Sequence, residues 1–205
     1  MDGEPGDDPD ARTGRTRHWL LDLPLSKLRR LGLILVLAGA ALFGGLDTVD
    51  TAVTQFDPGK PFDDGQFTVT LQRAALVPEV RAGARTLAPA KPDRRYLAIV
   101  TEIRNDGTVP GNLEDELDLR DQPGKEFVGA FRLADGTRLI RLGPGLIEQL
   151  AFIWMLPENT LAAGDSVTVR VWKKKYTELM VTYGQAWIDS LTDYGEATIP
   201  VRAQS

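Results

Sequence analysis

Cysteine is absent from this chain of 205 residues. The absence excludes disulfides, thiolate nucleophiles and cysteine-ligated zinc or iron–sulfur sites. A domain of about 140 residues buries enough surface to be stable without such cross-links. The lack of cysteine is therefore compatible with a location outside the cytoplasm.

Histidine is almost absent as well, since the chain has only His18, close to its N-terminus. The rest of the chain has no imidazole for general-base catalysis or for a zinc site. The serines that follow position 30 are Ser166, Ser190 and Ser205, and none lies in a nucleophile-elbow pattern. We therefore expect a protein that is not an enzyme, with no catalytic residues and no cofactor.

A strong excess of one charge is missing from the C-terminal part of the chain. Residues 65–205 contain 17 Lys and Arg against 18 Asp and Glu, whereas residues 1–64 contain 7 against 11. Nucleic-acid binding requires a basic surface that neutralises phosphates. We therefore expect no nucleic-acid partner.

Long hydrophobic runs are also scarce, and the longest uncharged one covers residues 31–46 (LGLILVLAGAALFGGL). As a helix it would be about 24 Å long at about 1.5 Å per residue, slightly short of a bilayer core of about 30 Å. We predict a single transmembrane helix that acts as a signal anchor in the lipid bilayer. Two alternatives are a buried helix of a soluble domain and a cleaved signal peptide, with residues 38–40 (AGA) as the cleavage site.

The charges on either side of this run predict its orientation. Six basic residues lie between positions 12 and 30, whereas residues 47–64 contain Lys60 and five aspartates. Basic flanks remain in the cytoplasm. The prediction is a single-pass plasma-membrane protein with a cytoplasmic N-terminus and an extracytoplasmic C-terminal domain.

Four segments follow from these patterns. Residues 1–30 form a cytoplasmic tail, polar and disordered at first and then basic beside the membrane. Residues 31–46 form the transmembrane helix, and residues 47–65, with two turn motifs at 57–59 (DPG) and 63–65 (DDG), form a linker. Residues 66–205 form the extracytoplasmic domain.

The C-terminal domain shows the two-residue period of β-strands. Apolar and polar residues alternate in several short segments separated by turns. The predicted strands cover residues 67–71, 96–103, 113–119, 126–131, 146–156, 167–171, 179–183 and 198–201. Residues 185–191 are expected to form at most a turn or two of helix. Such a series of strands predicts an all-β domain with an antiparallel β-sandwich.

Three segments carry a family resemblance. A hydrophobic strand ends in Asn105-Asp106-Gly107, residues 117–124 follow, and Gly143-Pro144-Gly145 precedes a strand that ends in Pro157. This pattern resembles the exported immunoglobulin-like domains of uncharacterised bacterial, in particular actinobacterial, envelope proteins. The small secreted immunogenic protein of mycobacteria is related to them in fold. The resemblance implies an immunoglobulin-like sandwich and supplies no catalytic residues.

Carboxylates concentrate near position 116. Glu114, Glu116 and Asp118 share one strand parity, opposite the leucines at 113, 117 and 119. We expect them to form a solvated face of the strand. The alternative is a weak calcium site, because clustered carboxylates are the ligands that calcium prefers.

Two aromatic residues flank a short basic run near the C-terminus, at Trp172, Lys173, Lys174, Lys175 and Tyr176. Lysines at a strand edge protect it from aggregation, and basic residues beside aromatics also bind polyanions or lipid headgroups. These five residues are therefore the candidate interaction surface. Trp154 lies in the middle of a strand and is expected in the core.

These observations lead to one main hypothesis and one alternative. The first is a non-catalytic, membrane-anchored binding or accessory protein of the cell envelope, whose partner is an envelope or membrane protein or polymer. The alternative is a carrier that holds a small apolar ligand or lipid between the two sheets of the sandwich.

Overall fold

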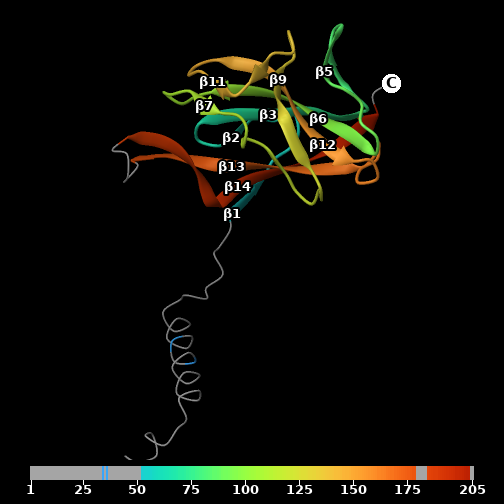
Figure 1. Ribbon diagram of the computed structural model, residues 1–205. Coiled ribbons are helices and arrows are strands. Elements are labelled where there is room, and N and C mark those ends of the chain that lie inside the picture. The colour runs from blue at the N-terminus through green and yellow to red at the C-terminus, as the bar shows by residue number, and fades with distance from the viewer. Residues whose placement is uncertain (1–33, 35, 37–51, 179–183, 204–205) are drawn as a thin grey trace, which may run out of the picture. The chain divides into compact units, whose positions relative to one another are not determined.

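The computed structural model describes residues 34, 36, 52–178 and 184–203 (Figure 1). The chain divides into two compact units, Met1–Val49 and Asp50–Ser205. The predicted tail and transmembrane segment lie in the first unit, of which only Ile34 and Val36 are described, and two isolated residues define no helix. Within the described residues, no helix has the length and apolar character needed to cross a bilayer.

All regular structure described between residues 52 and 203 is β-strand, so the all-β prediction is confirmed. Five long strands form most of the domain: β3 (Phe67–Val77), β6 (Arg94–Asn105), β12 (Ile147–Pro157), β13 (Ser166–Glu178) and β14 (Gln185–Ala203). The shorter strands are β1 (Ala52–Gln55), β2 (Phe62–Asp63), β4 (Val80–Ala82), β5 (Arg85–Ala88), β7 (Gly111–Asn112), β8 (Asp118–Leu119), β9 (Glu126–Arg132), β10 (Arg138–Leu139) and β11 (Arg141–Leu142).

The strands form two facing layers, which Figure 1 shows from the side. One layer has the order β10-β9-β12-β6-β3, with β2 also paired to β3. The other has the order β8-β13-β14, and β1 pairs with β14 along the edge opposite β13. The C-terminal end of β14 pairs with β3, so this one strand belongs to both layers. The arrangement is a β-sandwich closed along one side by β14.

The core between the layers comes from alternate residues of facing strands. Phe67, Val69 and Leu71 of β3 are fully buried, and the valines of β13 at 167, 169 and 171 face them across the core. A β-bulge between Leu71 and Arg73 reverses the alternation in β3. Beyond the bulge, Ala74 and Leu76 point into the core, and the residues between them point to the outer face of the sheet.

Strand β12 is buried on both sides, as its continuous apolar run predicts. Leu150, Phe152 and Trp154 point into the main core, where Trp154 is 3% exposed. Ile153 and Met155 belong to a second apolar cluster on the outer face of the same sheet. The prediction that Trp154 is a core residue is confirmed. The second cluster shows that this sheet has an apolar outer face as well.

The predicted linker, residues 47–65, is wrong for the part that the structure describes. Strand β1 pairs with residues 193–196 of β14, and β2 pairs with β3. Phe62 enters the main core, and Asp64 is only 1% exposed. The turn motifs are real, but they connect short strands of the domain, because an aromatic residue between them provides apolar surface to bury.

Two further predictions on strands need correction. Residues 185–191 are not helical but form the first part of β14. The sandwich is also not purely antiparallel, since β14 makes parallel pairs with both β1 and β3. Both differences arise from the length of β14, which pairs with β13 along most of its course and then continues into the other sheet. The strand predicted at residues 179–183 lies outside the described residues.

The strand predicted at residues 113–119 is mostly a turn. Only β8, Asp118–Leu119, is strand there, and residues 114–116 form a tight turn. Leu113, Leu117 and Leu119 are buried as predicted, but Glu116 is buried with them, at 1% exposed. The prediction from two-residue alternation is wrong here because successive side chains in a turn do not point to opposite faces, as they do in a strand.

Candidate functional site

A groove of about 630 Å³ lies on the outer face of the β3-β6-β12 sheet. Its floor follows from two cross-strand rows. Ala75 of β3 lies opposite Ala98 of β6, which lies opposite Ile153 of β12. In the next row, Val100 of β6 lies opposite Ala151 of β12. Residues that lie opposite each other on neighbouring strands project from the same face, so three alanines on three adjacent strands leave the floor low and apolar.

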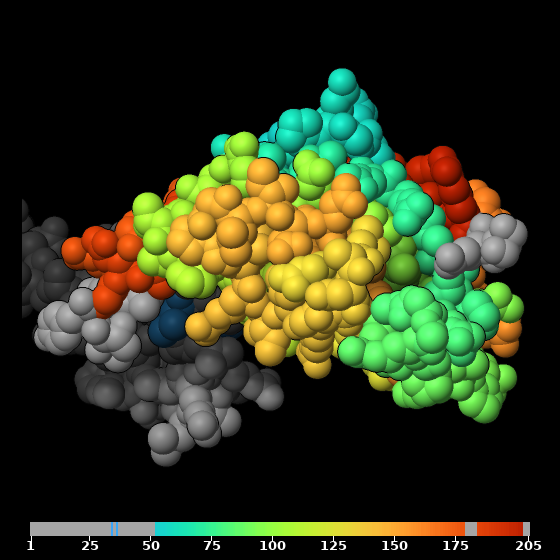
Figure 2. Space-filling model, turned by 90° about the horizontal axis from the view of Figure 1, so that it is seen from above, coloured from blue at the N-terminus to red at the C-terminus, as the bar shows by residue number. Residues whose placement is uncertain are grey.

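The β4–β5 hairpin forms one wall of the groove. Val80 at its base is buried in the outer apolar cluster together with Val77 and Ile153. The hairpin also lies close to the turn between β9 and β10, because a Cβ on Gly136 would collide with Ala82. In Figure 2 the green hairpin stands as a lobe beside the yellow surface of β9. The hairpin and Leu133 near the end of β9 thus raise walls above the alanine floor.

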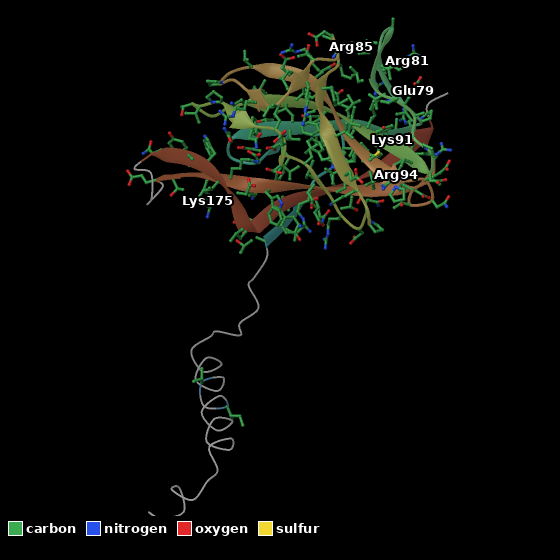
Figure 3. All side chains as sticks on the ribbon, viewed as in Figure 1. Glu79, Arg81, Arg85, Lys91, Arg94 and Lys175 are labelled. Atoms are coloured by element: carbon green, nitrogen blue, oxygen red, sulfur yellow. The ribbon has the colours of Figure 1, made fainter. Side chains whose placement is uncertain are left out.

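The rim of the groove is predominantly basic. Arg73, Arg81 and Arg202 line it together with one acidic residue, Glu79. Arg81 pairs with Glu79, with 3.3 Å between Nη1 and Oε1, and Figure 3 shows both on the β4–β5 side of the molecule. Arg73 and Arg202 are exposed and make no salt bridge with any described residue. Arg202 lies directly opposite Ala75, so a guanidinium stands at the end of the first alanine row.

A buried ionic cluster lies in another part of the domain, around Lys174 in the C-terminal half of β13. The Nζ atom of Lys174 is 2.6 Å from Oε2 of Glu116 and 3.1 Å from Oδ2 of Asp64. Both carboxylates are fully buried, and the Lys174 side chain is 9% exposed. The other oxygen of Asp64 accepts hydrogen bonds from the backbone N–H groups of Gln66 and Phe67. The cluster therefore joins β13 to the β2–β3 turn and to the turn at 114–116.

Burial governs the ionisation of this cluster. It raises the pKa of Glu116 well above its ordinary value, the neighbouring Asp64 carboxylate raises that pKa further, and the ammonium of Lys174 only partly opposes the effect. Burial alone would lower the pKa of Lys174, but the carboxylates of Glu116 and Asp64 outweigh it and the pKa rises. One cation faces two buried carboxylates and, at 3.4 Å, the partly exposed carboxylate of Asp189. These contacts hold β13 against the two turns, which is a structural role.

A second, smaller recess of about 310 Å³ has an acidic rim around aromatic side chains. Phe127 and Trp154 pack at 5.3 Å between ring centroids on its inner side. Its acidic residues are largely compensated within the chain. Among the described residues, Glu114 pairs with Arg138, Asp118 with Lys125, and Asp189 with Lys174.

The structure brings two of the three weak calcium candidates, Glu114 and Asp118, to the rim of the smaller recess but not Glu116. Glu116 points into the ionic cluster, whereas Glu114 and Asp118 bind separate basic residues, Arg138 and Lys125. Among the described residues, no group of three or more histidine, cysteine or acidic residues is arranged to hold a metal ion. The solvated face predicted for these carboxylates is also wrong for Glu116.

The candidate interaction surface at residues 172–176 divides into two parts. Trp172 packs edge-on against Tyr194 at 5.0 Å and lies under the guanidinium of Arg170, and Lys174 is the centre of the buried cluster. These two residues are structural. Lys175 and Tyr176 are exposed, and Lys173 is half-buried, so these three remain available for an interaction.

The groove was not predicted from the sequence. Its floor residues Ala75, Ala98 and Ala151 are far apart in the chain and become neighbours only through strand pairing. The one local signal is that small residues stand at outward positions of strands that are otherwise apolar on both faces. That signal alone does not distinguish a groove from a sheet covered by another element.

Comparison with known proteins supports the fold alone. No family model matches the chain, and no curated protein matches it in sequence. In structure it is similar to an uncharacterised β-sandwich protein from Clostridium difficile 630, with a TM-score of 0.51 and 12% identity over 74% of this chain and 97% of the other. A conserved hypothetical protein from Bacillus anthracis matches with a TM-score of 0.35 and 13% identity, over 56% of this chain and 87% of the other.

Proposed function

We propose that this chain is a non-catalytic binding protein of the cell envelope, anchored in the plasma membrane by residues 31–46. Its immunoglobulin-like β-sandwich is extracytoplasmic, and the groove on the outer face of β3, β6 and β12 is its binding site. The apolar run with its one-sided basic flank supports the anchor and its orientation. The absence of histidine and cysteine after residue 18 supports a role in binding and not in catalysis.

The ligand class follows from the chemistry of the groove. The apolar floor favours a hydrocarbon chain, and the arginines at the rim favour a negatively charged head. A volume of about 630 Å³ lies within the range typical of small-molecule sites. We infer that the groove holds an anionic amphiphile, with its chain along the alanine rows and its head beside Arg73 and Arg202.

One observation carries this proposal: a sheet face with three alanines at its centre and two arginines at its edge that are without an ion pair among the described residues. Among the described residues, apolar core side chains occupy the space between the sheets, which favours the outer face over the interior as a ligand site. Phe67, Leu97 and Phe152 are among these side chains and are fully buried. A carrier role would therefore use the outer face of the sheet and not the space between the sheets.

Binding is tested with the unit Asp50–Ser205 and hexadecanoate as the probe, followed by displacement of a fluorescent anilinonaphthalene sulfonate. Ala98→Trp places an indole on the floor of the groove and is expected to abolish binding. The double variant Arg73→Glu/Arg202→Glu is expected to weaken it roughly tenfold, since an exposed ion pair contributes up to about 1 kcal/mol.

The matched control is Lys60→Glu/Arg141→Glu, which makes the same charge change at two exposed positions that do not line the groove. Equal loss of binding in this control would attribute the effect to net charge. Binding that survives Ala98→Trp would place the ligand elsewhere. A photo-crosslinker at position 98 in native membranes separates a lipid adduct from a protein adduct, and a protein adduct would replace the amphiphile by a partner protein.

The anchor and orientation have an independent test. An alkaline phosphatase fused after Ser205 is active only outside the cytoplasm, and green fluorescent protein at the same position is fluorescent only inside it. The proposal expects an active phosphatase and a dark fluorescent protein. The opposite result would place the β-sandwich in the cytoplasm and remove the envelope role.

A further inference from the structure

A bulge of four residues in β14 interrupts its pairing with β13. Trp172 lies opposite Tyr194, but Lys174 already lies opposite Asp189. One residue of β13, Lys173, therefore faces four residues of β14, 190–193. Bulges of this kind redirect side chains away from the sheet.

The bulge is shaped by hydrogen bonds to a single side chain. The Ser190 hydroxyl oxygen accepts from the backbone N–H groups of Thr192 and Asp193, at 3.3 and 3.0 Å. Leu191 lies between Ser190 and Thr192. Its exposed fraction of 90% is the highest among the exposed large apolar residues of the described chain. A single exposed leucine is common on protein surfaces, so Leu191 matters here together with Ile188, which is also exposed and lies three residues earlier in the same strand.

The start of β1 lies beside this bulge. Strand β1 runs parallel to β14 with Ala52 opposite Asp193, so the first residue of β1 is next to the end of the bulge. Ala52 follows the predicted membrane segment, which ends at residue 46, by six residues. Six residues span at most about 20 Å. The chain length thus limits Ala52, which lies beside the end of the bulge, to at most about 20 Å from the end of the segment 31–46.

The surroundings of Leu191 suit a lipid surface. Residues 174–178 of β13 and 185–189 of β14 form a two-stranded arm, which Figure 1 shows at one end of the sandwich. On this arm Lys175 lies opposite Ile188, which is 48% exposed, so the two side chains project from the same face. Tyr176, which is 41% exposed, projects from the other face, where its ring lies 5.2 Å from that of Trp187. Figure 3 shows Lys175 on this arm, at the end away from the β4–β5 hairpin. Exposed apolar side chains beside a basic residue are typical of contacts with anionic bilayer surfaces.

We propose that the arm and the bulge at Leu191 rest on the outer leaflet of the same membrane, with Leu191 and Ile188 inserted at the boundary between headgroups and acyl chains. The contact would hold the sandwich at a fixed angle to the bilayer and so set the direction in which the groove opens. This inference rests on the membrane anchor of the proposed function.

The full chain allows a clean test because it has no native cysteine. A single cysteine introduced by Leu191→Cys is labelled with an environment-sensitive nitrobenzoxadiazole. The labelled chain is reconstituted in nanodiscs of phosphatidylcholine and phosphatidylglycerol, with or without lipids that carry a nitroxide high on the acyl chain. A second chain is labelled through Ile140→Cys, at a residue that is 52% exposed and lies outside the arm.

The expected result is a blue shift and a loss of emission with nitroxide lipids for the label at 191, and neither for the label at 140. Equal behaviour of the two labels, in a chain that co-elutes with nanodiscs, would refute the contact and leave the anchor standing. A chain that fails to co-elute with nanodiscs would refute the anchor, and the contact with it.

A second pair of variants tests the role of Leu191 itself. With the label at Ile188→Cys, adding Leu191→Asp is expected to abolish the quenching, whereas adding Leu191→Phe is expected to retain it. Because Leu191 is almost fully exposed, neither change disturbs the core. Quenching that is the same in both variants would mean that the leucine does not hold the arm on the lipid.

Discussion

The burial of Glu116 is not indicated by the residues next to it in the sequence. Its position between Leu113 and Leu117 suggests a solvent-facing side chain, but it is completely buried against Lys174, which is 58 positions later. No local pattern predicts this contact, because the chain reverses direction several times between the two residues. A lysine run that resembles an interaction surface likewise contributes its middle residue to the interior.

Lys174→Met tests the strength of this cluster. The change leaves Asp64 and Glu116 buried without their cation, and the loss of one partner from a buried ion pair costs about 3–5 kcal/mol. Urea unfolding followed by tryptophan fluorescence measures the difference. Lys175→Met is the control, since Lys175 is exposed and its loss is expected to change stability by less than about 0.5 kcal/mol. Equal effects at the two positions would mean that the buried pair contributes nothing.

The raised pKa of Glu116 predicts a pH dependence. The folded state holds the proton more tightly than the unfolded state, whose ordinary value is 4.5. The contribution of Glu116 to stability is therefore complete below 4.5 and is lost as the pH rises from there through the higher folded pKa. Glu116→Gln removes the titration. The stability of the natural chain relative to this variant is expected to fall over that interval, and a difference independent of pH would contradict the shift.

At the scale of elements, periodicity predicted the strands whose alternation is unbroken. The strand beginning at Phe67, the central strand ending at Asn105 and the long strand before Pro157 all lie where the pattern indicated. The pattern failed where geometry departs from a regular strand, at the turn 114–116 and in the short strands β1 and β2. Short edge strands depend on a partner already in place, and their few residues carry little period of their own.

Contact between elements makes Gly195 sensitive to substitution. The Phe62 ring lies over this glycine of β14, and a Cβ there would approach ring atoms at 2.5–2.8 Å. Phe62 is also stacked on Phe56 at 4.7 Å and cannot retreat without moving that ring. Gly195→Ala is therefore expected to destabilise the fold by about 1–3 kcal/mol in urea unfolding.

A double variant checks the cause of that loss. Phe62→Leu removes the colliding ring atoms, so Gly195→Ala is expected to cost less in the Phe62→Leu background than in the natural chain. Additive effects would show that the alanine acts through the backbone of β14 and not through the ring.

At the scale of the whole molecule, the domain begins before residue 66, the start that was predicted from the turn motifs at 57–59 and 63–65. A chain that starts at Asp50 keeps β1, β2, Phe62 and Asp64, whereas one that starts at Gln66 loses them all. The first is expected to unfold cooperatively on heating, as monitored by circular dichroism. The second is expected to lack a cooperative transition, because Lys174 and part of the core would lose their partners. A cooperative transition in both would restore residues 52–65 as a linker.

Strand β14 belongs to both sheets, and β1 enters the fold by lying parallel to it. A force applied to Ala52 along the axis of β1 acts parallel to β14. It loads the bonds between β1 and β14 together in shear, where peeling from an edge would break them one after another. The pairing of β1 with β14 therefore resists such a force, and it transmits the force to the one strand that both sheets share.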